Sequence, residues 1–392
     1  MNRIRNPRAL WIGAAVALGL VLTGCGITDD DGRPLTTLNP KGEQAQEIHN
    51  LAVPIFIVAG VVFVLVNAAV IMLAIRYRRR RHDQDGVDEP VQRHGNTPLE
   101  WGWTILPAVL LAFLAIDNVR VIWQLENDQR DAPMEVDVIG QQWWWEFRYD
   151  TNGDDKYDII TASQLVIPAG TTVRLNIRSN DVIHSFWIPA LSGKKDAVPG
   201  RVHHWAITAD EPGIYEGQCT EYCGLSHAYM RMQVKALSEA DYDTWVQNQL
   251  SPAVEPDEGS EAAAGKEIFF QKCASCHQVN GYDNNGERLD HDTPDPDYRG
   301  ALHPLIAGNA PNLTHLMSRN RFAGGMFDLH EGGGSDAGVA PEGAPNEANL
   351  GDWLRNPPGM KPMAADANRG MPNLNLPEDE IRKLVVYLSE LK

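Results

Sequence analysis

Positive charge is scarce in this chain of 392 residues, which has 34 Lys and Arg against 52 Asp and Glu and a formal net charge of −18. A surface that binds nucleic acid displaces counterions from the phosphates and is therefore basic. The composition argues against a nucleic-acid partner. Hydrophobic residues make up 43% of the chain, and this length accommodates two or three folded domains.

Cysteine is also scarce, and the spacing of the five cysteines divides them into three groups. Cys25 stands alone, Cys219 and Cys223 are four residues apart, and Cys273 and Cys276 are three residues apart. We expect a separate role for each group.

Residues 1–24 are typical of a lipoprotein signal peptide. A basic start is followed at residues 9–22 by an apolar run that is too short for a comfortable membrane span. The run ends in "LTGC", which resembles the bacterial lipobox, in which the cysteine becomes the lipidated first residue. An ordinary signal peptide with an incidental cysteine is the alternative. Because the motif directly follows the apolar run, we expect lipidation of Cys25.

Two apolar segments predict a transmembrane hairpin over residues 45–125. The first span covers about residues 51–75, and a helix of this length crosses a hydrocarbon core of about 30 Å. It runs into the basic stretch 76–81, which is expected to stay in the cytoplasm. The second span, about residues 101–123, returns the chain to the outer side. This is the side on which a lipid on Cys25 would lie.

Residues 130–240 predict an all-β domain on the outer side. Short β-rich runs such as residues 164–179 and 230–237 alternate with turn sequences such as "PAG" and "EPG". Several strands at this spacing predict an antiparallel sandwich or barrel.

The stretch "CTEYCGLSHAYM", residues 219–230, combines two cysteines, a histidine and a methionine. Thiolate, imidazole and thioether are ligands that copper prefers. Two thiolates four residues apart can bridge two metal ions, which leaves His227 and Met230 for the outer positions. A second imidazole is available at His184. A structural disulfide and a zinc site are the alternatives, but neither predicts the methionine together with a distant histidine.

Residues 251–264 are predicted to form a linker, and a second redox motif, "CASCH", follows it. In this motif Cys273 and Cys276 would carry heme c covalently, and His277 would be an axial ligand. A bare thiol–disulfide motif is the alternative, but it does not need the histidine. Helices are predicted before the motif and at the C-terminus, over residues 377–392.

The β domain and hairpin resemble subunit II of cytochrome c oxidase, whose cupredoxin domain holds a binuclear copper (CuA) centre. The matching pieces are "WTILPA" (103–108), "GQQWWWEF" (140–147), "HSFWIP" (184–189), "KDAVPGR" (195–201) and "GQCTEYCGLSHAYM" (217–230). The copper ligands that this resemblance implies are His184, Cys219, Glu221, Cys223, His227 and Met230. It also implies that Glu221 binds copper through its carbonyl oxygen and a magnesium ion, shared with subunit I, through its carboxylate.

Two further roles follow from the same resemblance. Trp143 corresponds to an exposed aromatic residue where electrons enter, whereas its alternative role is core packing on the same strand face as Trp145. Glu100 corresponds to a carboxylate at the mouth of a proton path into subunit I, and its alternative role is that of an interfacial carboxylate.

Residues 261–392 resemble class I cytochrome c and predict an all-α domain. By this resemblance Pro311 accepts the proton of the His277 imidazole and orients the ring. The sixth ligand is expected to be Met371, since a proline follows it shortly before the last helix. Met363 is the second choice, and Met360 is a third methionine in the same region. The long stretch 277–311 and the Gly-rich stretch 324–345 are expected to be surface loops.

Together these features predict the electron-input subunit of a caa-type oxidase, anchored in the bacterial inner membrane with its soluble domains on the periplasmic side. The resemblance implies donation by cytochrome c or a cytochrome bc complex, and transfer through heme c and CuA to heme a of subunit I. There, oxygen reduction is coupled to proton pumping, with further oxidase subunits and membrane lipid as partners. A CuA-type nitric oxide reductase subunit is the nearest alternative, and a copper-delivery lipoprotein is a more distant one.

Overall fold

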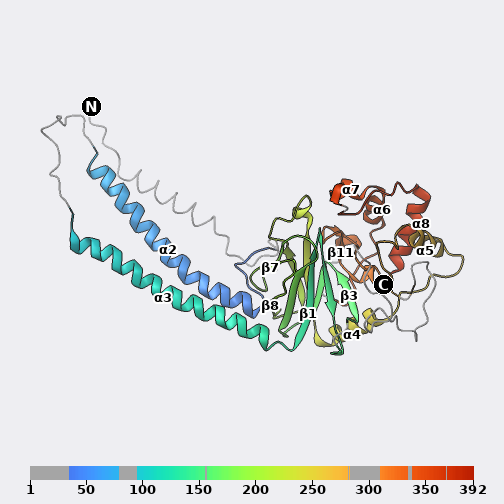
Figure 1. Cartoon of the computed structure of the whole chain (residues 1–392), viewed down its shortest axis with the longest axis horizontal. Helices are drawn as coiled ribbons and strands as arrows, with labels where there is room; N and C mark the ends of the chain where they lie inside the picture. The colour runs from blue at the N-terminus through green and yellow to red at the C-terminus, as the bar shows by residue number, and fades with distance from the viewer. Residues whose placement is uncertain are drawn as a thin grey trace.

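The structure is a computed structural model, which describes residues 35–78, 95–154, 157–280, 282, 310–333, 338–367 and 369–392. The expected signal peptide, Cys25 and most of the stretch 277–311 lie outside these residues. The described chain consists of a helical hairpin, a β domain and a helical C-terminal domain (Figure 1). The fold class predicted from the sequence is confirmed. The expectation of a purely antiparallel β domain is wrong, because residues 134–141 pair in parallel with 173–179, as do residues 164–168 with 231–237.

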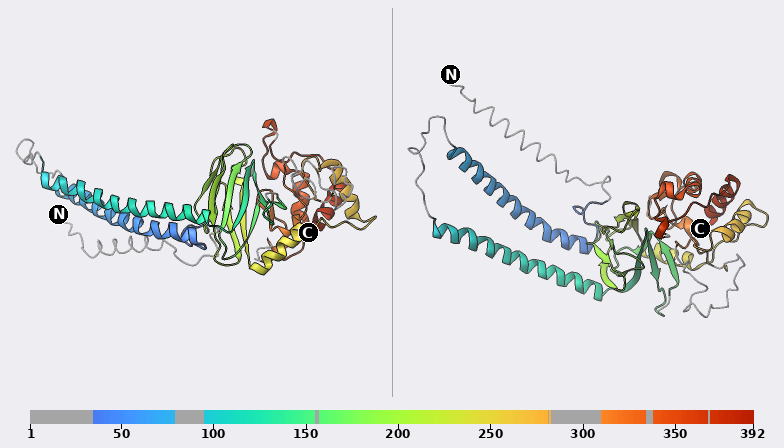
Figure 2. Two further views of the ribbon diagram at one scale, coloured as in Figure 1. Left: turned by 60° about the horizontal axis from the view of Figure 1, so that its bottom comes forward. Right: turned by 45° about the horizontal axis from the view of Figure 1, so that its top comes forward.

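Two long helices, α2 (Glu43–Arg76) and α3 (Thr97–Arg130), run side by side away from the β domain (Figures 1 and 2). Each has 34 residues and therefore a length of about 51 Å at 1.5 Å per residue. Their most apolar windows have mean hydropathies of 2.9 and 2.0, and almost none of these windows is buried within the chain. Both helices are long and apolar enough to cross a membrane.

The foot of the hairpin is attached to the β domain by backbone hydrogen bonds. Lys41 N donates to Ala190 O at 2.7 Å, and Asp210 N donates to Lys41 O at 2.9 Å. Ala45 N, in the first turn of α2, donates to Leu191 O at 3.1 Å. The start of α2 is therefore fixed against the β domain, and the basic end of this helix at Arg76 points away from it.

The β domain is a sandwich of two main sheets. One has the strand order β3-β2-β1-β5-β8 and the other β4-β10-β9, while β6 and β7 form a short hairpin. The strands are β1 (Met134–Gln141), β2 (Trp144–Tyr149), β3 (Ile159–Ala162), β4 (Gln164–Pro168), β5 (Val173–Ser179), β6 (His184–Phe186), β7 (Lys195–Ala197), β8 (His203–Ile207), β9 (Gly213–Gln218) and β10 (Arg231–Leu237). In β5 every second residue is buried, as expected for a strand with one face on the core.

The core of the sandwich is continuous and contains the sulfur-bearing side chains. Trp145, Phe147 and Phe186 pack edge to face within it. Cys219, Cys223 and Met230 belong to the same buried cluster; the complete cluster also includes most inward-facing aliphatic residues of the strands. The short helix α4 (Glu239–Leu250) covers the end of the sandwich through Trp245.

The C-terminal domain is mainly helical. It contains α5 (Glu261–Lys272), α6 (Glu347–Arg355), α7 (Pro357–Met360) and α8 (Glu378–Glu390), the 3-10 turns η2 (Leu316–Ser318), η3 (Glu331–Gly333) and η4 (Ala365–Ala367), and the small hairpin β11–β12 (Arg321–Phe322 and Phe327–Asp328). Helices α5 and α8 cross closely at Gly265, where a Cβ would collide with the carbonyl oxygen of Lys383. Phe269 and Tyr387 pack beside this crossing.

The segment predicted as a linker packs into the C-terminal domain. Ala253 is buried in its core, and Ser251 O accepts a hydrogen bond from His315 Nε2 at 3.0 Å. Glu255 pairs with Lys266 at 2.6 Å, and α5 already begins at Glu261, within the predicted linker. Residues 251–260 therefore extend the domain and do not form a free spacer.

The expectation that residues 324–345 form a surface loop is wrong for the first part of this stretch. Leu329 and His330 are buried, and Gly324 O accepts a hydrogen bond from Arg231 N of the β domain at 2.8 Å. The glycines permit close approach to the neighbouring domain, and Gly324 has φ +77°. A Gly-rich sequence can reflect tight contact as well as exposure.

Candidate metal centre

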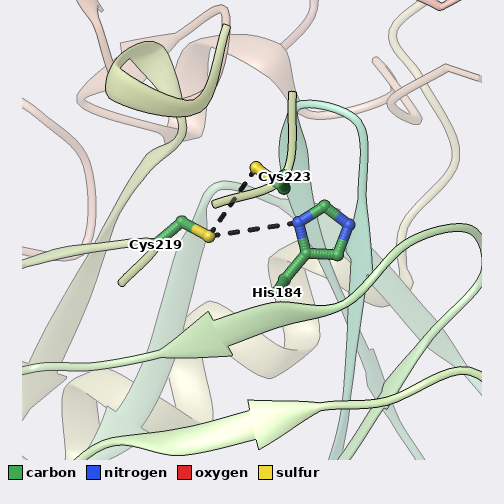
Figure 3. A group of neighbouring side chains, drawn as sticks. All are labelled: His184, Cys219 and Cys223. Carbon is green, nitrogen blue, oxygen red and sulfur yellow. Dashed lines mark hydrogen bonds between the residues drawn. The ribbon is translucent and has the colours of Figure 1, made fainter. Parts of the chain in front are cut away.

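Two thiols and an imidazole meet at the end of the sandwich (Figure 3). Cys219 Sγ lies 3.9 Å from Cys223 Sγ and 4.0 Å from His184 Nδ1. His184 is fully buried, and the two cysteines are 4% and 3% exposed. The group is therefore shielded from water and has its soft donor atoms turned toward one another.

The remaining predicted ligand residues surround the same sulfur pair. Cys223 Sγ lies 3.4 Å from His227 Nδ1 and 3.8 Å from Met230 Sδ. The carbonyl oxygen of Glu221 lies 3.3 Å from Cys219 Sγ. Two thiolates, two imidazoles, a thioether and a carbonyl oxygen form a donor set that suits a pair of copper ions.

The loop between β9 and β10 has a backbone that brings these donors together. Cys219 N donates to Met230 O at 2.9 Å and closes the loop at its base. Gly224, with φ +110°, turns the chain so that His227 N can donate to Gly224 O. On the opposite side, Gly140 leaves room for His184, whose Cδ2 would lie 2.8 Å from a Cβ at position 140.

The two adjacent thiols shift each other's pKa in opposite directions. The hydrogen bond from Cys223 lowers the pKa of Cys219 to about 4, although burial opposes this change. The neighbouring Cys219 sulfur and burial raise the pKa of Cys223. The first proton therefore leaves easily and the second is retained, because two adjacent buried thiolates repel each other. Bound cations would remove this repulsion, which fits a site for metal ions.

Asp181 is a site residue that the sequence interpretation missed. Its Oδ1 accepts a hydrogen bond from His184 Nε2 at 2.7 Å. Since a carboxylate oxygen can only accept, a proton lies on Nε2, and Nδ1 is the ring nitrogen that faces Cys219. Burial alone would lower the pKa of His184, but the hydrogen bonds to Asp181 and Cys219 outweigh it and raise the pKa. A carboxylate three residues before a candidate ligand histidine was the available signal.

Trp143 lies beside the centre but is only 2% exposed, so the expectation of an exposed side chain is wrong. It occupies the turn between β1 and β2 and is not a strand residue. The C-terminal domain covers it, with Lys361 Nζ donating to Trp143 O at 2.6 Å. The indole Nε1 donates to Cys223 O at 3.0 Å. Trp145, in contrast, is fully buried in the core, as expected.

The residues proposed for heme lie in the C-terminal domain. Cys273 is buried and Cys276 is exposed, directly after α5. His277 Nδ1 donates to Pro311 O at 2.9 Å, which leaves Nε2 free as a ligand atom. Burial lowers the pKa of His277, the hydrogen bond to Pro311 opposes this change, and the nearby Arg319 charge adds to it. This arrangement fits covalent heme attachment with an oriented axial histidine.

The two leading candidates for the sixth ligand lie near each other. Met371 Sδ accepts a hydrogen bond from Trp353 Nε1 at 3.0 Å and packs against the core of the C-terminal domain. A Cβ on Gly370 would lie 2.6 Å from Met363 Cβ and 3.8 Å from Trp143 Cζ3. Met363 and Gly370 therefore lie together beside Trp143, and Met371 directly follows Gly370 in the chain.

Glu100 is not brought to the metal centre. It lies in the first turn of α3, at the end of the hairpin that is far from the β domain (Figure 1). Its side chain is exposed, and Oε1 accepts a hydrogen bond from Asn96 N at 3.1 Å. This contact stabilises the start of the helix, and the predicted role in a proton path stays a prediction.

Sequence comparisons find matches to known families along nearly the whole chain. Family descriptions match in three places: "Cytochrome C oxidase subunit II, transmembrane domain" over residues 38–121, "Cytochrome C oxidase subunit II, periplasmic domain" over residues 158–237, and "Cytochrome c" over residues 262–392. Cytochrome c oxidase subunit 2 of Alkalihalophilus pseudofirmus is 33% identical over 382 residues, covering 96% of this chain and 95% of the relative. The protein of the same name from Bacillus subtilis is 31% identical over 408 residues and covers 99% of both chains.

A solved structure of the periplasmic domain of subunit II of cytochrome oxidase from Bradyrhizobium japonicum is 28% identical. The alignment covers 30% of this chain and 94% of that one, with a TM-score of 0.29.

The site and the matches define a membrane-anchored redox subunit with periplasmic domains, a CuA-type copper centre and a c-type heme domain. The chain belongs to the cytochrome c oxidase subunit II family. It is therefore a subunit of an oxidoreductase complex that includes subunit I, and its domain order is consistent with a caa3-type oxidase.

Proposed function

We propose that this chain collects electrons for a bacterial heme–copper oxidase and passes them from heme c through CuA to heme a of subunit I. The observation that supports this most directly is the position of Trp143. Its indole donates to Cys223 O at 3.0 Å, while its backbone oxygen accepts from Lys361 of the cytochrome domain at 2.6 Å. One residue thus contacts both the copper loop and the heme-bearing domain.

In this proposal the copper-binding residues act as a fixed cage. Cys219 and Cys223 would bridge two copper ions, with His184, His227, Met230 and the Glu221 carbonyl at the outer positions. When bound, the copper pair and the heme iron each exchange one electron at a time. The ligand residues are largely buried and hydrogen-bonded, so they would move little during electron transfer.

The heme-binding residues would hold iron in a similarly fixed environment. Cys273 and Cys276 would attach heme c, His277 would bind iron through Nε2, and Met371 would supply the second axial ligand. The carbonyl oxygen of Pro311 fixes the imidazole by accepting a hydrogen bond from Nδ1 at 2.9 Å. This contact holds the ring orientation and makes Nε2 the only ligand atom available.

Several finer assignments belong to the same proposal. The Glu221 carboxylate would bind magnesium at the boundary with subunit I, and Glu100 would stand at a proton-path entrance. Proton pumping would take place in the partner subunits. Cytochrome c or a cytochrome bc complex would be the donor, and a lipid on Cys25 would anchor the chain to the outer face of the bacterial inner membrane.

The test is to purify the intact membrane complex and measure gas consumption with reduced cytochrome c as donor. We expect oxygen uptake and, from metal analysis, two coppers in the CuA site in addition to copper in subunit I. Reduction of nitric oxide without oxygen uptake would assign the chain to a nitric oxide reductase instead. Loss of turnover in Cys223→Ser, with heme c retained, would place the copper site on the electron path.

A further inference from the structure

Two loops of the cytochrome domain meet the cupredoxin domain at the turn that holds Trp143. Lys361, at the start of the loop 361–370, donates from Nζ to Trp143 O at 2.6 Å and to Ala323 O at 2.8 Å. Ala323 belongs to the other loop, residues 320–325. A single amino group therefore connects the turn to both loops of the neighbouring domain.

Other contacts surround this lysine and join the same two domains. They are Arg231 N to Gly324 O at 2.8 Å, Ser226 Oγ to Pro362 O at 2.6 Å, Arg321 Nη1 to Glu216 Oε1 at 3.0 Å, and Gln164 Nε2 to Asn320 Oδ1 at 2.6 Å. Two of the cupredoxin residues, Ser226 and Arg231, are direct sequence neighbours of His227 and Met230. The cytochrome domain thus contacts the loop that carries most of the candidate copper ligands.

The interface is close-packed. A Cβ on Gly324 would collide with Lys361 Nζ and would lie 2.7 Å from Trp143 O. Ala364 and Val339 of the cytochrome domain pack against the apolar core of the cupredoxin domain. Together with the buried Gln164–Asn320 contact, this packing distinguishes the interface from a loose encounter between tethered domains.

We propose that Lys361 is a positioning residue that docks the cytochrome domain on the Trp143 turn, so that this domain occupies the electron-accepting surface of the copper centre and excludes an external donor from it. The inference rests on the proposed function, because it takes Trp143 as the place where electrons reach copper. While the domain is docked, the Trp143 side chain is 2% exposed, and an external protein cannot contact it. Electrons from outside must then pass through the cytochrome domain.

Removal of the Lys361 amino group should weaken the docking of the cytochrome domain on the cupredoxin domain. In Lys361→Met the carbonyl oxygens of Trp143 and Ala323 would lose their donor inside the interface. Buried acceptors without a partner are costly, so the loss of this donor should weaken the interface. The surrounding contacts would remain, so we expect a larger undocked population and not complete separation.

The test uses hydrogen exchange in the purified oxidase complex, with the Arg231 backbone amide as the reporter. This N–H donates across the interface to Gly324 O, so it exchanges when the domains separate. In Lys361→Met we expect its exchange to be on the order of tenfold faster than in the native complex. The matched control is Lys383→Met, which removes a lysine that pairs with Asp379 on α8 of the same domain.

A second variant approaches the interface from the other domain. Glu216→Gln removes the negative charge of the cupredoxin partner of Arg321, and it should accelerate exchange by a smaller factor than Lys361→Met does. Unchanged CuA and heme c spectra, together with unchanged exchange in α8, would show that both domains are folded. Oxidation of heme c by the rest of the complex should slow in Lys361→Met and stay native in Lys383→Met.

Equal exchange of the Arg231 amide in Lys361→Met and Lys383→Met would overturn the docking proposal. Faster exchange with an unchanged rate of heme c oxidation would also overturn it, because docking would then not position the domain for transfer. The proposed function is judged separately, in the complex with native Lys361, by whether heme c oxidation requires an intact copper site. The two failures are therefore distinguishable.

Discussion

Replacement of Asp181 by asparagine should weaken copper binding without removing any proposed copper ligand. The Asp181 carboxylate accepts three hydrogen bonds, from His184 Nε2 at 2.7 Å, Val182 N at 2.7 Å and Gln142 N at 2.8 Å. The first two reach Oδ1 and the third reaches Oδ2. An asparagine amide can present its oxygen to only one of these sides.

The expected magnitude follows from the better of the two amide orientations. With the oxygen at the Oδ1 position, the contact to His184 survives without its charge, and the NH₂ group opposes the Gln142 N–H. A hydrogen bond to a charged group contributes about 1.5–3 kcal/mol. Loss of a carboxylate that orients a metal-ligating histidine typically lowers metal affinity about 10- to 100-fold. These two estimates agree, since tenfold corresponds to about 1.4 kcal/mol.

The assay is a competition titration of the copper site against a chelator, followed by electron paramagnetic resonance of the mixed-valence pair. Asp210→Asn is the matched control, because Asp210 is an exposed carboxylate of the same domain. We expect Asp181→Asn to hold copper about 10- to 100-fold more weakly and the control to match the native protein. A native copper affinity in Asp181→Asn would refute the argument that Asp181 sets the His184 orientation.

Four further substitutions test the proposed roles of individual residues. Cys223→Ser should abolish the mixed-valence copper signal and leave heme c attached, because one thiolate cannot bridge both metals; two retained coppers with the native spectrum would contradict the ligand assignment. Met371→Ala should remove the thioether–iron absorption band and lower the heme potential, whereas Met363→Ala should leave both nearly native; the opposite pattern would move the ligand to Met363. Trp143→Gln should leave both spectra intact and slow heme c oxidation in stopped flow, and an unchanged rate would make Trp143 a packing residue.

The copper-site residues could be predicted from the sequence because their chemistry is concentrated in a short segment. Cys219, Cys223, His227 and Met230 lie within 12 residues, and His184 was available as a second imidazole. The family resemblance added Glu221. The structure places the donor atoms of all six around one pair of sulfur atoms. Local spacing was informative here because one loop supplies most of the donors.

The hydrogen bond between Asp181 and His184 and the burial of Trp143 under the cytochrome domain could not be predicted in the same way. The contact between Asp181 and His184 depends on the conformation of a turn, which residue types alone do not specify. The burial of Trp143 depends on how two domains pack, and Lys361 is more than 200 residues away in the sequence. The same packing explains why a Gly-rich stretch expected at the surface instead contacts Arg231 at its start. Tertiary contacts of this kind carry no local sequence pattern.

Electron transfer in series, from heme c through CuA, is tested most directly by time-resolved oxidation of the fully reduced complex by oxygen. The near-infrared band of CuA and the visible band of heme c would be followed together in the native complex and in Cys223→Ser. Transfer in series predicts that CuA is oxidised first and that heme c follows at a rate independent of protein concentration. In Cys223→Ser, heme c should stay reduced. Oxidation of heme c in Cys223→Ser at the native rate would contradict it.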